Sequence, residues 1–178
     1  MEGESAMPES PKPASAHTRD ANAAAAAALS FDDPGDWARA RRGLIATHET
    51  GRIEVGGHAV WDTSRYDFLR TDEPAPDTVH PGLWRQAKLN AIHGLFEVGD
   101  GVWQARGYDI SNITFMAGDE GWLIIDPLTT ASTAAACLEL ANTTLGERPV
   151  KAVIYTHSHS DHYGGVLGVT SADDVAAG

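Results

Sequence analysis

The chain has 178 residues, of which 42% are hydrophobic, 7% aromatic and 21% charged. Its formal net charge of −12 argues against nucleic acid or an anionic membrane as the main partner. No stretch approaches the roughly 20 apolar residues of a membrane span, and a single cysteine, Cys137, excludes an internal disulfide framework. The length is sufficient for one globular domain with its own core.

The first 30 residues, Met1 to Ser30, differ in composition from the rest of the chain. Prolines alternate with Ser and Ala, an alanine run follows, and large apolar side chains are almost absent. Such a segment cannot bury enough apolar surface to offset the entropy of ordering, so residues 1–30 are predicted to be a disordered leader. Its acidic start differs from the basic start of a secretory signal. We therefore expect a cytoplasmic protein, with a periplasmic or secreted location as the alternative.

Residues 31–93 are predicted to form an N-terminal arm with short helices. The sequence Asp32-Asp33-Pro34 suits a helix start, which predicts a helix over 35–46. Residues 49–79 contain scattered aromatic residues among turn formers, and we expect an ordered arm with little regular structure there. Apolar residues at helical spacing predict a second helix over 80–93.

From Gly94 onward the pattern changes to strands. Two hairpins are predicted from their glycine-containing turns, one joining strands 95–98 and 102–106 and the other joining strands 112–117 and 122–126. The second hairpin ends in the run Trp122-Leu123-Ile124-Ile125, which is continuously apolar, as in a strand covered on both faces.

A βαβ unit is predicted over residues 122–156. Apolar residues recur at helical spacing from Thr129 or Thr130 to Leu145, and the β-branched run 150–156 reads as a strand. The two strands of such a unit are parallel, and ligand sites lie beyond their carboxyl ends. Asp126 and His157 occupy those positions.

Four metal-ligand side chains lie within six positions directly after the last predicted strand: His157, His159, Asp161 and His162. In extended backbone the first three point the same way, whereas His162 projects differently, so Asp161 and His162 are candidates for a second centre. Imidazole and carboxylate donors suit zinc, and also iron or manganese. Two metals sharing a water would supply hydroxide near neutral pH, which indicates metal-assisted hydrolysis without identifying the bond.

The motif His157-x-His159-x-Asp161-His162 resembles that of the metallo-β-lactamase superfamily. The resemblance implies an α/β (α+β) fold, with residues 94–178 forming the first half of an αββα sandwich. It also implies that His157 and His159 bind one metal, and that Asp161 and His162 bind a second. Asp126 would orient the site from behind the ligands.

Longer stretches resemble the linear alkylsulfatases, also called SDS hydrolases. These are Trp84-Arg85-Gln86, residues 107–115, residues 121–128 and residues 156–165. The resemblance implies hydrolysis of primary alkyl sulfates to alcohol and sulfate, two Zn²⁺ ions per active site and a homodimer. Asp161 would orient the bridging water as a metal ligand.

The same family places further metal ligands, sulfate-binding residues and a general acid later than Gly178. We therefore expect an N-terminal fragment, inactive by itself, of a full-length enzyme. Two alternatives remain: another hydrolase of this fold acting on thioesters, lactams or phosphodiesters, or a non-catalytic metal-binding module. Three residues between the two hairpins and at the start of the second, Tyr108, Asp109 and Asn112, either line the mouth of the site or serve as turn residues.

Overall fold

The computed structural model describes residues 12–31 and 33–177. Contacts divide the described residues into two compact units, one of residues 12–31 and 33 with 72–87 and the other of residues 34–71 with 88–177. None of the described helices is long and apolar enough to cross a membrane.

The first unit contains helix α1 (Ala16–Ala28) and most of helix α3 (Pro81–Asn90). The Ser15 hydroxyl caps α1 by accepting a hydrogen bond from the Thr18 amide at 3.1 Å. No residue of α1 is buried, so the helix depends on this cap and on the high helical propensity of alanine. The predicted disorder is therefore wrong for these residues, because the prediction weighed burial and not local propensity. Residues 1–11 of the predicted leader lie outside the described residues.

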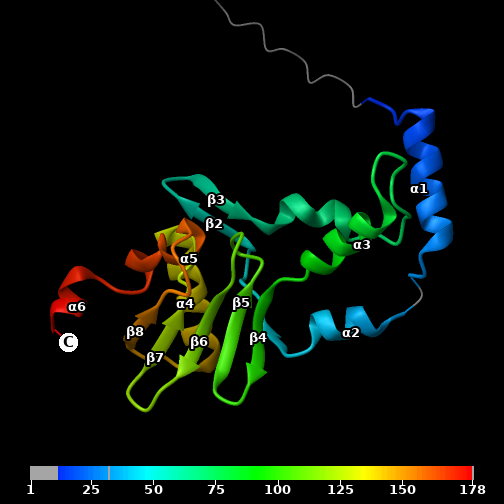
Figure 1. The fold of residues 1–178 in the computed structure, drawn as a ribbon. Coiled ribbons are helices and arrows are strands. Elements are labelled where there is room, and N and C mark those ends of the chain that lie inside the picture. Colours follow the sequence, from blue (N-terminus) through cyan, green and yellow to red (C-terminus); the bar gives the residue numbers. More distant parts are fainter. Residues whose placement is uncertain (1–11, 32, 178) are drawn as a thin grey trace, which may run out of the picture. The chain divides into compact units, whose positions relative to one another are not determined.

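The second unit is built on a six-stranded sheet in the order β1-β4-β5-β6-β7-β8 (Figure 1). Its strands are β1 (Leu44–Ala46), β4 (Gly94–Gly99), β5 (Val102–Arg106), β6 (Ile113–Ala117), β7 (Trp122–Ile125) and β8 (Val150–Ile154). All neighbouring pairs are antiparallel except β7 and β8, which are parallel. Both predicted hairpins and the predicted parallel strand pair are confirmed.

Helix α4 (Ala131–Leu145) connects β7 to β8, and Thr130 caps it as the sequence predicts. Its small residues Ala134, Cys137 and Ala141 are fully buried in the core together with Phe115 and Trp122. The indole of Trp122 also donates to the Asn142 side-chain oxygen at 2.7 Å. The helix is thereby fixed against the sheet, which sets the position of the segments at both of its ends.

Two predictions about the arm are wrong. The helix expected over 35–46 ends early: α2 covers Gly35–Arg41, and the residues after Gly43 pair with β4 as strand β1. Gly43 has φ +79°, and a Cβ there would lie 2.1 Å from the Glu97 carbonyl oxygen, so the chain turns where only glycine fits.

The segment expected to have little regular structure forms a hairpin and a 3-10 helix. Strands β2 (Arg52–Val55) and β3 (His58–Asp62) pair with each other, and η1 (Thr63–Leu69) follows. The hairpin contacts α4 and contributes Ile53 to the core. Its formation depends on this packing, which local sequence patterns do not reveal. Short helices α5 (Ser160–Tyr163), η2 (Val166–Gly168) and α6 (Ala172–Ala177) complete the chain.

Candidate metal centre

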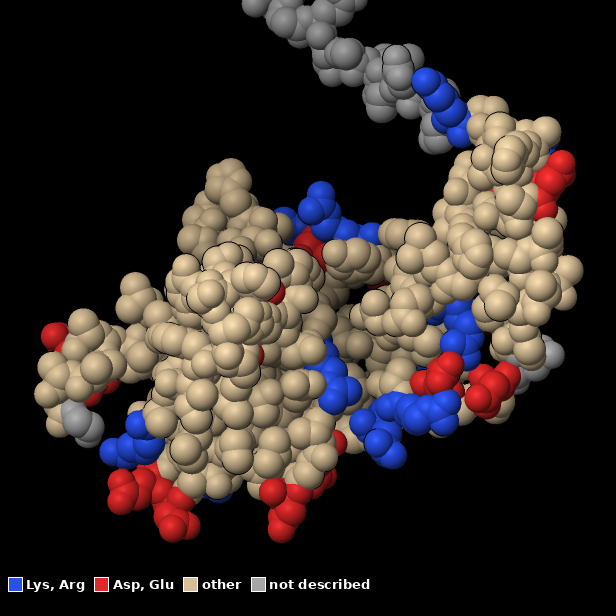
Figure 2. Space-filling view, viewed as in Figure 1, with Lys and Arg blue, Asp and Glu red and all other residues tan. Residues whose placement is uncertain are grey.

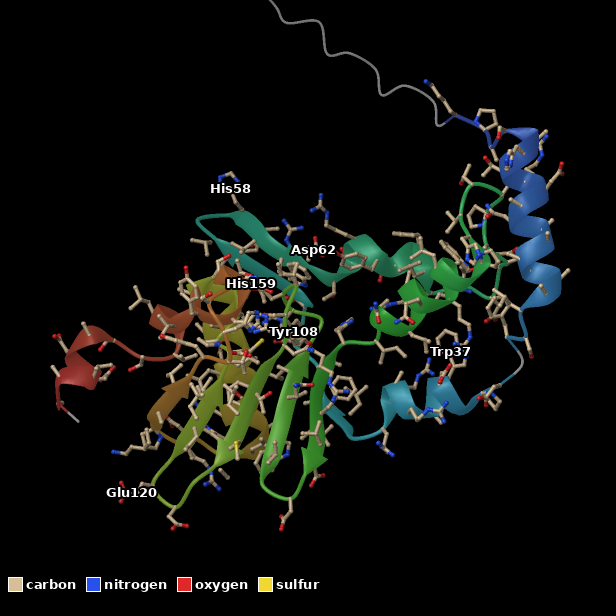
Figure 3. All side chains as sticks on the ribbon, viewed as in Figure 1. Trp37, His58, Asp62, Tyr108, Glu120 and His159 are labelled. Carbon is tan, nitrogen blue, oxygen red and sulfur yellow. The ribbon has the colours of Figure 1, made fainter. Side chains whose placement is uncertain are left out.

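The predicted metal ligands lie at the carboxyl ends of the two parallel strands. Asp126 directly follows β7, and the segment from Thr156 to His162 follows β8. Figure 3 shows His159 at the end of the strands opposite to Glu120, which lies in the turn between β6 and β7. Acidic side chains also lie at that turn end of the sheet on the face shown in Figure 2.

Asp126 is the buried carboxylate behind the centre, with an exposed fraction of 7%. It accepts hydrogen bonds from the Thr156 amide (2.8 Å), the Thr156 hydroxyl (2.7 Å) and His162 Nδ1 (2.8 Å). Burial by itself raises the pKa of Asp126, but the bonds from Thr156 and His162 outweigh it, and the net pKa lies below the ordinary value. Asp126 is therefore ionised at neutral pH and ties the two strand ends together.

These bonds fix the orientation of two imidazole rings. His162 Nδ1 donates to the Asp126 carboxylate, and its Nε2 faces an Asp161 carboxylate oxygen at 3.3 Å. The Thr156 hydroxyl donates its hydrogen bond to Asp126. Its oxygen is therefore left to accept a hydrogen bond from His157 Nδ1 at 2.9 Å. The Nε2 of His157 then faces His159 Nδ1. One carboxylate thus orients two predicted ligands, His162 directly and His157 through Thr156.

The four predicted ligands form two close pairs. His162 Nε2 lies 3.3 Å from an Asp161 carboxylate oxygen, and His157 Nε2 lies 3.0 Å from His159 Nδ1. Neighbouring ligand atoms around a tetrahedral zinc ion are separated by about 3.3 Å, given metal–ligand bonds of roughly 2.0–2.1 Å. The pairs are the same ones that the sequence assigns to the two metals, and their donor chemistry fits a divalent cation.

Neither pair is a complete site. Within residues 12–31 and 33–177, no three His, Cys, Asp or Glu side chains are arranged to hold one metal ion. His157 and His159 are exposed, whereas Asp161 and His162 are half-buried. A catalytic zinc normally has three protein ligands, so each pair would need at least one more donor.

The ligand loop packs against residues 127–131 through glycines. A Cβ on Gly165 would lie 2.1 Å from the Pro127 carbonyl oxygen, and one on Gly164 would lie 2.4 Å from that of Thr129. The facing segment has unusual backbone: Asp126 and Leu128 have φ of +56° and +64°. Non-glycine residues in this region cost about 1–3 kcal/mol each, and such strain is typical of functional sites.

The structure places the three other candidate residues in different environments. Tyr108 is 2% exposed and its hydroxyl accepts from the His48 amide at 2.7 Å. Asp109 is buried and its carboxylate accepts from Thr129 and Thr133 at the start of α4. Asn112 is exposed. The polar groups of Tyr108 and Asp109 are thus engaged within the fold, and only Asn112 is free to line a site mouth.

Sequence reasoning missed two residues next to the candidate centre. The Thr156 hydroxyl lies between the Asp126 carboxylate and His157 and is hydrogen-bonded to both. Its position directly before the first histidine was the sequence signal that could have revealed this role. Ser111 is buried, and its hydroxyl donates to the backbone carbonyl of Asp161. The two residues are 50 positions apart, so no local pattern could reveal that contact.

The chain is similar to proteins of known families. Residues 106–178 match the family model of the metallo-beta-lactamase superfamily. The chain is 47% identical to a linear primary-alkylsulfatase and to an (R)-specific secondary-alkylsulfatase, both from Pseudomonas sp. These matches cover 100% and 94% of the chain but 27% and 25% of the relatives. The chain therefore spans about a quarter of the length of the curated relatives it matches.

The chain is also similar to a solved alkylsulfatase structure. The stereoselective inverting sec-alkylsulfatase Pisa1 from Pseudomonas sp. superposes with a TM-score of 0.87 at 48% identity, over 93% of this chain and 26% of that one. The resemblance seen in the sequence and the mixed α/β fold are both confirmed. The superfamily match implies use of a divalent metal.

Proposed function

From this relationship to the metallo-β-lactamase superfamily and its alkylsulfatases, we propose that the chain supplies the metal-binding loop of a hydrolase of primary alkyl sulfate esters. The products would be an alcohol and sulfate. The identity of 47% to two alkylsulfatases is the observation that carries the assignment to alkyl sulfate esters, and the choice of primary esters follows from the resemblance seen in the sequence. The paired donors after β8 support it, because their chemistry suits the metal-assisted hydrolysis of an ester.

We further propose that the metal is zinc and that two ions bind, one at His157 with His159 and the other at Asp161 with His162. When bound, the ions would polarise the sulfate ester and activate water. The residues of this chain hold the ligands in place: Asp126 orients His162 directly and His157 through Thr156, so that the Nε2 atom of each ring faces the other ligand of its pair. Each ion needs further ligands, which we expect from the length of the relatives that this chain does not span. A homodimer is likewise proposed from the family resemblance.

The direct test is release of sulfate from dodecyl sulfate by the purified full-length protein. We expect turnover that is lost after dialysis against a chelator and restored by Zn²⁺. A secondary alkyl sulfate serves as the comparison substrate and should be hydrolysed more slowly. Turnover of a thioester, a lactam or a phosphodiester without turnover of any alkyl sulfate would overturn the proposal.

The role of Asp161 can be tested separately by the substitution Asp161→Ala. Loss of this ligand should lower turnover by about 100-fold or more and reduce the zinc content. Asp173→Ala removes an exposed carboxylate from the nearby helix α6 and serves as the matched control, with turnover expected to be unchanged. Full zinc content and full turnover in Asp161→Ala would show that this carboxylate is not a ligand.

A further inference from the structure

The short helix that carries Asp161 and His162 has little support of its own. Helix α5 spans only Ser160–Tyr163, and no side chain caps its start. A single helical turn is unstable in isolation, because nucleation costs more than one or two hydrogen bonds return. The orientation of Asp161 relative to His162 must therefore be set by contacts from elsewhere in the fold.

One such contact comes from the loop between β5 and β6. Ser111 lies in that loop with an exposed fraction of 8%, and its hydroxyl donates to the Asp161 carbonyl. The bond joins the backbone of a predicted metal ligand to a segment 50 residues earlier in the chain. A rotation of the Asp161 backbone would break this bond and leave a buried hydroxyl without its acceptor.

The loop that carries Ser111 is itself held firmly. The Asp109 carboxylate accepts from the Ile110 amide (2.7 Å) and from both the amide (3.1 Å) and the hydroxyl (2.6 Å) of Thr129. It also accepts from the Thr133 hydroxyl at 2.7 Å, within the first turn of α4. The three bonds from Thr129 and Thr133 fix the loop to the segment between β7 and the first turn of α4, and the bond from Ile110 lies within the loop.

The other end of the loop is fixed by the β2–β3 hairpin and by buried rings. The Trp61 indole donates to the Gly107 carbonyl at 2.8 Å. Tyr108 packs edge-on against His93, with ring centroids 5.6 Å apart, and also against His48. Ser111 is therefore attached to a rigid part of the core rather than to a mobile loop.

We infer that residues 107–111 act as a brace for the metal loop, and that Ser111 is the positioning residue that sets Asp161 against His162. This inference rests on the proposed metal centre and deepens it. The Asp161 side chain would bind the metal, whereas Ser111 would touch neither metal nor substrate and would act through the Asp161 backbone. The brace would keep the two donors at the separation that a shared metal ion requires.

The test is the metal affinity of the variant Ser111→Ala in the full-length protein. Zn²⁺ affinity is measured by competition with a chromophoric chelator, well below the melting temperature, so that only folded protein contributes. We expect one of two zinc sites to weaken by about tenfold or more. The visible spectrum of the Co²⁺-substituted protein should change as well, because it reports ligand geometry. Ser111→Thr keeps the hydroxyl donor and should restore the affinity.

Thr144→Val is the matched control, because it removes a hydroxyl that donates to a backbone carbonyl, that of Leu140 in α4, away from the metal loop. Its zinc affinity and Co²⁺ spectrum should equal those of the unmodified protein. A Ser111→Ala variant with a lower melting temperature but unchanged zinc affinity and Co²⁺ spectrum would refute the proposed role of residues 107–111 as a brace for the metal loop. Metal affinity is read independently of sulfate release, so failure to hydrolyse alkyl sulfates would overturn the proposed function and leave this result standing.

Discussion

Asp126 shows how one residue can organise the centre. Its carboxylate holds the ends of β7 and β8 together through Thr156, and it orients His157 and His162 for binding through Nε2. Its backbone has φ +56°, a conformation that aspartate tolerates better than most residues. Leu128, two positions later, has no such tolerance, so its strain must be offset by packing, and it is 1% exposed.

Tyr108 allows a prediction of how stability depends on pH. Burial raises the pKa of its phenol to about 12, from about 10 in an unfolded chain. Below pH 10 the phenol is neutral in both states. Above pH 10 the unfolded state loses the proton first, so the free energy of unfolding should fall as pH rises from about 10 to about 12.

The substitution Tyr108→Phe should remove that part of the alkaline destabilisation. At neutral pH it should cost about 1 kcal/mol of stability, because the His48 amide loses its acceptor. Urea unfolding at pH 8 and at pH 11 measures both effects. Tyr66→Phe, at an exposed tyrosine, is the control and should retain the pH dependence of the unmodified protein. Equal pH dependence in all three proteins would refute the assignment to Tyr108.

At the scale of elements, the sequence predicted best where local pattern and tertiary structure agree. The strands from β4 to β8 and helix α4 follow their hydrophobic periodicity and turn residues closely, and the predicted parallel pair places Asp126 beside the histidine loop. The β2–β3 hairpin was missed because its burial depends on α4, far along the chain. Ser111 was missed for the same reason, since its role exists only through contact with Asp161.

The close packing of the ligand loop on the β7–α4 connection gives a prediction at this scale. Gly165 has no room for a side chain, because its Cβ would lie 2.1 Å from the Pro127 carbonyl oxygen and 2.6 Å from that of Thr130. Both obstacles are backbone atoms next to strained or capping residues, and they cannot move cheaply. Gly165→Ala should therefore destabilise the protein by about 1–3 kcal/mol and displace the ligand loop.

Thermal unfolding and zinc affinity together test this expectation, and both should decrease. Gly99→Ala is the matched control, because a Cβ there would make only an ordinary contact, 4.0 Å from that of Val102. Its stability should change by no more than about 0.5 kcal/mol. If Gly165→Ala were as stable as Gly99→Ala, the ligand loop would not be packed as the structure has it.

At the scale of the whole molecule, the two units differ in how they are stabilised. Helix α1 buries no residue, whereas the sheet, α4 and the β2–β3 hairpin share one core. Contacts separate the units along the chain, with residues 34–71 and 88–177 forming the second. Helix α1 depends mainly on local propensity, with a hydrogen bond from the Asn22 side chain to the Asp77 carbonyl at 2.8 Å, whereas long-range packing holds the second unit, so the second should unfold with more cooperativity.

Cys137 can report on that core without any labelling elsewhere, because it is the chain's one cysteine. It is 1% exposed at the centre of α4, and burial raises the pKa of its thiol above the ordinary range. A disulfide reagent such as DTNB at pH 8 should therefore react only when α4 separates from the sheet. We expect the native chain to react at least about 1,000-fold more slowly than the chain in denaturant, which corresponds to an opening free energy of about 4 kcal/mol or more.

Tyr108→Phe and Gly165→Ala should accelerate labelling in proportion to their loss of stability, since both lie against the same core. Rapid labelling of the native chain would mean that the sheet and α4 do not form a stable core in solution.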